Sequence, residues 1–263
     1  MSMRHAIIGA TGFVGGALAR HLEGLGEDIQ RLSRPEFDLR HPETFAAADT
    51  ARSCILDCAA CIDGTEEEIR AVNVDGFALF LNHCDAAPPA QYVYFSTSST
   101  LSDRHIGESA YVRSKRDAEK LVLARPWGRV VRLSFPFGIG ENPERLVSRL
   151  IRKALAGERL VLGDVVLPLT PIGFLAARLP AILDSCQHEV NFTDGRLYHL
   201  RDVAESIFTA LGLPGAWDDD PECQADLSVI DPSLHPNDID ALELVRGMCV
   251  LARDAAILDT RPA

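Results

Sequence analysis

A glycine-rich turn near the start of the chain has the spacing needed to bind a diphosphate. An apolar run ends at Gly9, Gly12 and Gly15 follow, and a helical pattern begins at once. Gly9 permits a sharp turn, Gly12 lets a pyrophosphate approach the backbone, and Gly15 lets the helix pack close to the strand. The helix N-terminus offers unpaired N–H groups to the phosphates. Structural turns can also carry GxxGxxG, but a position between strand and helix favours nucleotide binding.

Hydroxyl, phenol and ammonium groups form a second candidate site. The predicted strand 91–95 leads into Ser96-Thr97-Ser98-Ser99-Thr100, hereafter the hydroxyl segment. Open α/β sheets bind ligands at the carboxyl ends of their strands, although a helix-capping turn has the same composition. Tyr111 and Lys115 follow on a predicted helix, where a spacing of four residues puts both side chains on one face. Such a pair also arises by chance, but its place after the hydroxyl segment indicates one shared cleft.

The elements that position these residues alternate along the chain. Predicted strands cover residues 28–32, 36–39, 54–60, 91–95, 129–135 and 159–162. Predicted helices cover residues 12–25, 65–86, 108–125, 144–156, 174–183 and 201–211, and a further helix opens at His41-Pro42. The acidic run 218–222 is predicted to be a charged surface loop.

The end of the strand 28–32 bears on the choice of cofactor. In a dinucleotide-binding fold this position faces the adenosine ribose, where an acidic residue would bind the 2′-hydroxyl of NAD. Ser33 and Arg34 stand here instead, and they would favour the 2′-phosphate of NADP. A solvated loop arginine is the structural alternative, and Glu36 nearby weakens the preference for NADP.

Composition narrows the possible functions. The net charge of −12 argues against a general nucleic-acid binder, which needs a basic face. No apolar run reaches the roughly 20 residues that span a bilayer. The chain enters its first strand too early for a signal peptide, so a cytoplasmic protein without membrane or nucleic-acid partners is expected.

The seven cysteines fit reduced thiols better than a disulfide framework because their number is odd and their spacing uneven. Cys54, Cys58 and Cys61 reproduce the spacing of the iron–sulfur motif of radical SAM enzymes. The predicted strand 54–60 would turn these thiols to different faces, so we expect no metal site and interpret them as buried apolar side chains.

Together these motifs resemble the extended short-chain dehydrogenase/reductase superfamily, in its NAD-dependent epimerase/dehydratase group. The similarity runs from Met3 to about Gly140 and continues loosely to about Gly212. Besides the glycine turn and the Tyr–Lys pair, it is carried by Asp38-Leu39, Ala59-Ala60, Asn73-Val74-x-Gly76, Phe95-Ser96-Thr97-Ser98, and Arg132-Leu133 with Gly138. These features in this order are specific to the superfamily but not to a substrate.

The resemblance implies an α/β fold, with a Rossmann doubly wound parallel sheet and a small C-terminal substrate lobe. Residues 1–140 would form the NAD(P)-binding domain, to which residues 166–185 return. Residues 141–165 and 186–263 would form the lobe. A homodimer through the helices 65–86 and 108–125 is common in the superfamily.

The resemblance also implies a nicotinamide cofactor, NADP by the argument above, with NAD possible. Asp38 and Leu39 would hold the adenine, and Tyr111 and Lys115 the ribose of the nicotinamide half. The residues expected to bind the cofactor are Gly9, Thr11, Gly12, Phe13, Val14, Gly15, Ser33, Arg34, Asp38, Leu39, Ala59, Ala60, Asn73, Tyr111, Lys115 and Pro136.

The catalytic residues implied by the family are Ser98, Tyr111 and Lys115. Tyrosine is the proton donor or acceptor, and an adjacent ammonium lowers the phenol pKa from about 10 toward the working pH. Ser98 would bind the substrate carbonyl, with Thr97 as the alternative. Hydride passes to or from the nicotinamide.

Two departures from the family pattern bear on the substrate. Ser99-Thr100 stand where 4,6-dehydratases carry an Asp-Glu pair, which argues against water elimination. The connection from Ser98 to Tyr111 is unusually short, and so is the lobe, so the substrate site is expected to be smaller or more open. The short span before Asp38 resembles the dTDP-4-dehydrorhamnose reductase branch.

These observations predict an NADP-dependent reductase that acts on a ketone. The expected substrate is a keto-sugar nucleotide or a related carbohydrate-like intermediate. An epimerase with tightly held NAD is one alternative. A non-catalytic nucleotide sensor is another, although a sensor would not need the phenol.

Overall fold

The computed structural model describes residues 3–101, 109–226 and 240–259, and its contacts divide the chain into two units. The first comprises Met1–Leu133 and Leu175–Asn191, and the second comprises Ser134–Phe174 and Phe192–Ala263. The sequence prediction placed the corresponding boundaries at residues 140, 166 and 185.

The first unit is built on a six-stranded sheet. Its strands are β1 (His5–Ile8), β2 (Ile29–Leu32), β3 (Cys54–Asp57), β4 (Gln91–Thr97), β5 (Gly128–Leu133) and β9 (Glu189–Phe192). Their order is β2-β1-β3-β4-β5-β9, and the pairings from β2 to β5 are parallel. After β2 the chain crosses to the other side of β1, so the strand order reverses there. A ligand cleft is expected at this switch point.

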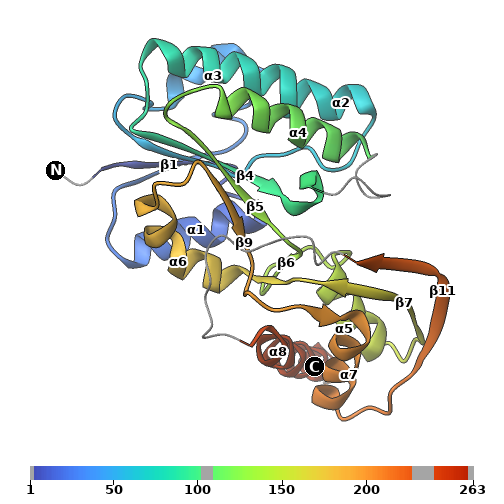
Figure 1. Ribbon diagram of the computed structural model, residues 1–263. Helices are drawn as coiled ribbons and strands as arrows, with labels where there is room; N and C mark the ends of the chain where they lie inside the picture. The colour runs from blue at the N-terminus through green and yellow to red at the C-terminus, as the bar shows by residue number, and fades with distance from the viewer. Residues whose placement is uncertain (1–2, 102–108, 227–239, 260–263) are drawn as a thin grey trace. The chain divides into compact units, whose positions relative to one another are not determined.

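Helices cover both faces of this sheet, which confirms the predicted α/β class. Figure 1 shows α1 (Phe13–Gly24) and α6 (Ile172–Asp184) on one side. On the other side lie α2 (Glu66–Arg70), α3 (Phe77–Ala86) and α4 (Ala110–Leu123). Strands buried on both faces read as apolar runs, as β1 and β3 do. A π-helical segment, Ala71–Gly76, joins α2 to α3 within the single predicted helix 65–86.

The predicted strand 36–39 is wrong. Phe37 is buried and packs edge-on against Phe80, with ring centroids 5.0 Å apart. The backbone N–H of Asp38 donates to Thr44 Oγ1 (3.1 Å), within the turn that leads to the 3₁₀ helix Pro42–Ala47. Because the aromatic core and this side-chain bond already hold the segment, it joins no sheet.

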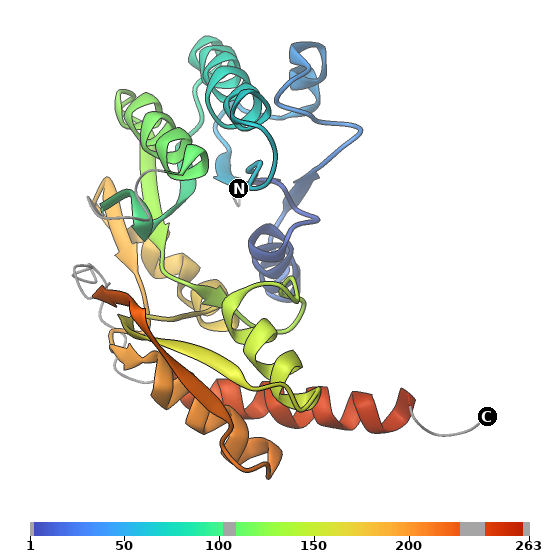
Figure 2. The same ribbon diagram turned by 90° about the vertical axis from the view of Figure 1, so that its right-hand side faces the viewer.

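The second unit has its own core around a three-stranded sheet in the order β10-β7-β11. The strands are β7 (Leu160–Leu167), β10 (Tyr198–His199) and β11 (Trp217–Asp226), and the helices are α5 (Leu146–Leu155), α7 (Leu200–Leu211) and α8 (Ala241–Asp259). A two-stranded ladder, β6 (Pro136–Phe137) with β8 (Thr170–Pro171), also belongs to this unit. In Figure 2, β7 (yellow) and β11 (orange-red) run side by side.

The predicted loop at 218–222 is also wrong, because these residues lie in β11, although most of them are exposed as predicted. Two arginines allow this acidic stretch to pair as an edge strand. Arg159 Nη2 bonds Asp218 Oδ1 (2.6 Å), and Arg201 Nη2 bonds Asp219 Oδ1 (2.7 Å).

Among the described residues, no helix has both the length and the apolar character needed to cross a bilayer.

A substitution at Gly15 tests the close approach of α1 to the glycine turn. A Cβ at Gly15 would lie 2.4 Å from the carbonyl oxygen of Gly9. We expect Gly15→Ala to lower the free energy of unfolding by about 1–3 kcal/mol, the usual cost of overpacking. Urea denaturation of the purified protein measures this change.

Gly24 provides the matched control in the same helix. No atom lies within 4 Å of a Cβ built there. Gly24→Ala should leave stability unchanged or raise it by up to about 1 kcal/mol. Equal effects of the two alanines would contradict the packing argument.

Candidate functional site

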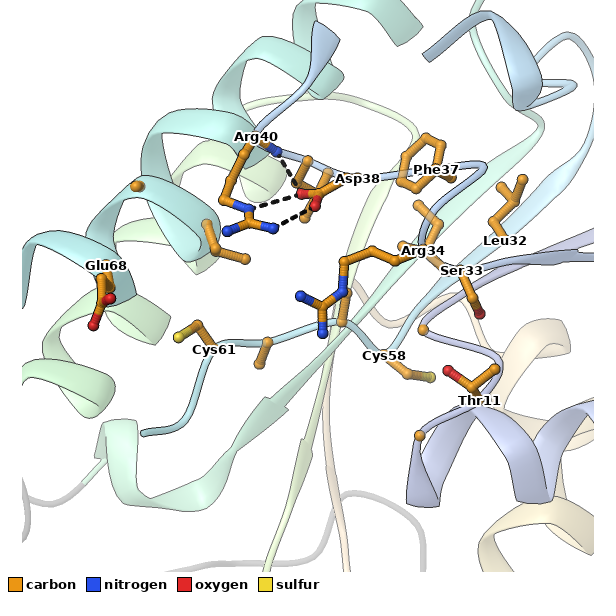
Figure 3. Close-up of a pocket in the computed structure, with 18 of the residues that line it drawn as sticks. Thr11, Leu32, Ser33, Arg34, Phe37, Asp38, Arg40, Cys58, Cys61 and Glu68 are labelled. Carbon is orange, nitrogen blue, oxygen red and sulfur yellow. Dashed lines mark hydrogen bonds and ion pairs between the residues drawn. The ribbon is translucent and has the colours of Figure 1, made fainter. Parts of the chain in front are cut away.

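The carboxyl ends of β1, β2 and β3 surround a cleft of about 490 Å³, hereafter the strand-end cleft (Figure 3). It lies at the switch point of the sheet, where open α/β sheets bind ligands. Nine of the predicted cofactor residues line it: Gly9, Thr11, Gly12, Ser33, Arg34, Asp38, Leu39, Ala59 and Ala60. The sequence prediction missed further lining residues, among them Arg40, Cys58, Cys61 and Glu68.

The glycine turn has the geometry of an anion cradle. Gly9 adopts a positive φ of 74°, which a residue with a side chain rarely takes, and Gly12 N–H donates to Gly9 O (2.9 Å). Gly12 is the N-cap of α1, and no side chain caps the helix there. The first-turn N–H groups, which include those of Phe13 and Val14, therefore have no side-chain acceptor at this end. Phe13, Val14 and Gly15 are not among the residues that line the cleft.

Ser33 and Arg34 give the cleft a polar wall at the end of β2. The hydroxyl oxygen of Ser33 is buried and has no hydrogen-bond partner among the described residues. Figure 3 shows the Arg34 guanidinium projecting into the cleft. A buried donor without a partner costs free energy unless a ligand satisfies it. A hydroxyl and a guanidinium together suit a phosphate.

Asp38 is tied to Arg40, which also lines the cleft. The Asp38 carboxylate accepts hydrogen bonds from Arg40 Nη2 (2.6 Å), Nε (3.1 Å) and the backbone N–H (3.0 Å), as the dashed lines in Figure 3 show. These bonds lower the pKa of Asp38 to about 2. Asp38 is therefore an ionised acceptor at neutral pH. The only signal for Arg40 in the sequence was its position two residues after Asp38.

Asn73 lies outside the strand-end cleft and hydrogen-bonds the backbone of Cys61, which lines it. Its Nδ2 donates to Cys61 O (2.8 Å) and to Ser114 Oγ (2.9 Å), and its Oδ1 accepts from Cys61 N–H (2.7 Å). These bonds tie the loop after β3 to α4. Gly76 is needed nearby because a Cβ there would lie 2.3 Å from the carbonyl oxygen of Leu39.

Lys115 is buried between α4 and the sheet. Its side chain is 1% exposed, its Nζ donates to Phe95 O (2.7 Å), and it lies 3.9 Å from the centroid of the Tyr94 ring. Burial lowers the pKa of the ammonium to about 8. Tyr111 is half-buried one turn earlier on the same helix. The segment 102–108, most of the short connection before Tyr111, lies outside the described residues.

Within the hydroxyl segment, Ser98 differs from its neighbours. Thr97 Oγ1 bonds Ser99 Oγ (3.2 Å), and Ser96 and Thr100 both donate to Glu119 Oε1 (2.5 and 2.9 Å). Ser98 begins the 3₁₀ helix Ser98–Leu101, and the described residues provide no partner for its hydroxyl.

An ionic cluster anchors this segment. It consists of the buried Glu119 and Arg132 and the more exposed Glu189. Arg132 bonds Glu119 through Nε and Nη2, with an Nη2–Oε2 distance of 2.6 Å, and its Nη2 also contacts Glu189 Oε2 (2.6 Å). The side chains of Arg132 and Glu119 are 7% and 8% exposed. The cluster holds Ser96 and Thr100 on either side of Ser98 and so fixes the backbone that carries Ser98.

The remaining predicted positions lie apart from the strand-end cleft. Ser98, Tyr111 and Lys115 do not line it, and Pro136 belongs to the second unit.

Within residues 3–101, 109–226 and 240–259, no cluster of three or more His, Cys, Asp or Glu side chains could hold a metal ion. Strand β3 ends at Asp57, earlier than predicted, and Cys54 is buried within it.

Comparison with protein families gives a match over most of the first unit and part of the second. Residues 6–173 match the model of the NAD dependent epimerase/dehydratase family. A curated relative from Streptomyces antibioticus is 28% identical over 233 residues, which cover 80% of this chain and 77% of the relative. It is named a probable dTDP-4,6-dihydroxy-2-methyloxan-3-one 4-ketoreductase.

Solved structures share the fold at lower sequence identity. The dTDP-glucose 4,6-dehydratase of Bacillus anthracis, solved with NAD, has a TM-score of 0.79 at 17% identity, covering 96% of this chain and 97% of that chain. The RMD protein of Pseudomonas aeruginosa, solved with NADPH, has a TM-score of 0.78 at 17% identity, covering 95% of this chain and 98% of that chain. These likenesses agree with the Rossmann fold described above.

Proposed function

The chain belongs to the NAD dependent epimerase/dehydratase family of short-chain dehydrogenase/reductase enzymes, and we propose that it is an NADP(H)-dependent reductase of a keto-sugar nucleotide. The observation that carries this proposal is the combination of the strand-end cleft with a serine directly after β4 and a tyrosine and a buried lysine on α4. A nicotinamide cofactor supplies the hydride. The residues of this chain bind it, orient the substrate and move the proton.

The strand-end cleft fits the adenosine half of the cofactor. The uncapped N-terminus of α1 suits the diphosphate, and the small side chains of Ala59 and Ala60 leave room beside the ribose and the base. The ionised Asp38 is an acceptor suited to the exocyclic amine of adenine. The unsatisfied hydroxyl of Ser33 and the guanidinium of Arg34 favour a 2′-phosphate, and hence NADP.

Ser98, Tyr111 and Lys115 supply the proton chemistry of the proposal. The hydroxyl of Ser98 donates a hydrogen bond to the substrate carbonyl, which makes the carbonyl carbon a better hydride acceptor. Tyr111 gives its phenolic proton to the oxygen as the alcohol forms. The charged form of Lys115 lowers the pKa of Tyr111 and binds the ribose of the nicotinamide half.

The substrate class is taken from the relative and from one feature of this sequence. The Streptomyces antibioticus relative is named a ketoreductase of a dTDP-linked sugar, and this chain carries Ser99-Thr100 in place of an acidic pair for water elimination. Reduction of a ketone on a nucleotide-linked sugar is consistent with both observations.

The direct test is a titration with NADPH and NADH, followed by a panel of keto-sugar nucleotides read at the nicotinamide absorbance. We expect tighter binding of NADPH and consumption of NADPH with at least one keto-sugar. Cofactor that stays bound through purification, without turnover of added NADPH, would indicate an epimerase instead.

A variant at Arg34 tests the choice of cofactor. Loss of one charge-assisted hydrogen bond to a phosphate costs about 1.5–3 kcal/mol. We therefore expect Arg34→Ala to raise the Kd for NADPH by roughly 10- to 100-fold and to leave the Kd for NADH nearly unchanged. Fluorescence titration with both cofactors measures the two constants.

Arg52→Ala is the matched control because Arg52 is exposed, lies outside the strand-end cleft and carries the same charge. It should change neither constant. Equal losses for NADPH and NADH in Arg34→Ala would argue against a 2′-phosphate site.

A further inference from the structure

We propose that Asp57 is the positioning residue for Lys115: its buried carboxylate provides the counter-charge that keeps the lysine protonated in the interior. This inference rests on the proposed function, in which the charged lysine tunes Tyr111. Asp57 is the last residue of β3 and has no role in the site as described so far.

Strand pairing brings Asp57 and Lys115 to the same face of the sheet. Asp57 and Tyr94 are register partners on β3 and β4, so their side chains lie next to each other on one face. Lys115 Nζ lies over the Tyr94 ring on that face, 3.9 Å from its centroid. Tyr92, two residues earlier on β4, reaches Asp57 from the same side, and its hydroxyl donates to Asp57 Oδ2 (2.7 Å).

Both residues are almost completely buried. Asp57 is 0% exposed and Lys115 is 1% exposed. The hydrogen bond of Lys115 in the described structure goes to the carbonyl oxygen of Phe95, which carries no net charge. An ammonium in the interior needs a nearby anion, because burial without one favours the neutral amine.

Glu119 is the other carboxylate near Lys115, one turn further along α4, but it is paired directly with Arg132. Its carboxylate accepts hydrogen bonds from two guanidinium nitrogens of Arg132 and from the hydroxyls of Ser96 and Thr100. Asp57, in contrast, forms no ion pair within the described part of the chain, and its partners are the neutral Tyr92 hydroxyl and the Ala59 N–H.

The other titratable groups around Lys115 are neutral at working pH. Burial raises the pKa of Cys58, Tyr92 and Tyr94 well above their usual ranges. The pKa of Lys115 is lowered mainly by burial, and Asp57 is the largest of the contributions that oppose this shift, ahead of Glu119 and Cys58. Burial also raises the pKa of Asp57, whereas its hydrogen bonds from Tyr92 and Ala59 and the charge of Lys115 favour the ionised carboxylate. Removing the charge of Asp57 should therefore make Lys115 lose its proton at a lower pH.

The first test is the pH profile of kcat/KM for Asp57→Asn. Asparagine keeps the shape of the side chain and removes the charge. Its Oδ1 can still accept from the Ala59 N–H, and its Nδ2 can donate to the Tyr92 hydroxyl oxygen. We expect the alkaline limb of the profile to move to lower pH by roughly one unit or more, the usual effect of a nearby opposite charge. Tyr92→Phe, which removes a hydrogen bond of Asp57 but no charge, should lower stability and leave the limb in place.

The second test needs no turnover. Urea unfolding of the wild type, Asp57→Asn, Lys115→Met and the double variant gives the coupling free energy between the two residues. We expect a favourable coupling at about pH 7, where the lysine is charged, and none at about pH 10, where it is neutral.

The outcomes separate this inference from the proposed function. An unmoved alkaline limb together with a coupling that is the same at both pH values would overturn the role of Asp57 and leave the reductase proposal intact. Full activity of Tyr111→Phe would overturn the proton donor of the reductase proposal, whereas the unfolding cycle would still decide whether Asp57 and Lys115 form a pair.

Discussion

Tyr111→Phe is expected to lower kcat by about 10²- to 10⁴-fold, the range measured when a general acid is removed. The substitution deletes one phenolic oxygen from a half-buried position on α4 and keeps the aromatic ring. Because the strand-end cleft does not include Tyr111, the adenosine half of NADPH should still bind. The measurements are the steady-state rate of NADPH oxidation with a keto-sugar nucleotide and a fluorescence titration with NADPH.

Two further variants serve as controls for Tyr111→Phe. Ser98→Ala should lower kcat by a smaller factor, because it removes a hydrogen bond to the carbonyl and leaves the proton donor in place. Thr97→Ala should have little effect on kcat, because the Thr97 hydroxyl already bonds Ser99. If Tyr111→Phe retained turnover while binding NADPH, the proton would have to come from another group.

Arg132→Met is expected to cause the largest loss of stability among the single substitutions considered. It removes the cation from the ionic cluster and leaves the buried carboxylate of Glu119 without its guanidinium partner. Breaking a buried pair in this way lowers the free energy of unfolding by about 3–5 kcal/mol. Urea denaturation at neutral pH measures the change.

An exposed ion pair in the second unit gives the matched control. Arg159 and Asp218 are 59% and 61% exposed, so Arg159→Met should cost less than about 1 kcal/mol. Similar losses in the two variants would mean that burial does not decide the strength of the Arg132–Glu119 pair. Since Glu119 also holds Ser96 and Thr100, a drop in kcat is expected in Arg132→Met even where the protein remains folded.

Local patterns were enough to predict most of the first unit. Helix α1 follows from the glycine turn. The start of α2 follows from Thr65, whose hydroxyl accepts from Glu68 N–H while its own N–H donates to the Glu68 side chain. The strands β3, β4 and β5 were apparent as apolar runs because strands covered on both faces need apolar side chains on both sides.

The errors arose where a distant partner decides the local structure. Residues 36–39 have the residue types of a short strand, yet Phe37 is held in the aromatic core against Phe80 and no strand pairs with the segment. Residues 218–222 have the composition of a solvated loop, yet Arg159 pairs with Asp218, Arg201 pairs with Asp219, and β7 pairs with the backbone. Neither arginine is close to this stretch in sequence.

The sequence by itself determined the family, the glycine turn and the order of the serine, tyrosine and lysine, because these depend on residue types at short spacings. Only the tertiary structure decided which side chains line the strand-end cleft together. It showed that Arg40, beside Asp38, is one of them. It also assigned the amide of Asn73 to the loop after β3, and it brought Asp57 to the face of the sheet on which Lys115 is buried. The physical reason is that burial and strand pairing set the environment of a charge, and both are made by residues far apart in the chain.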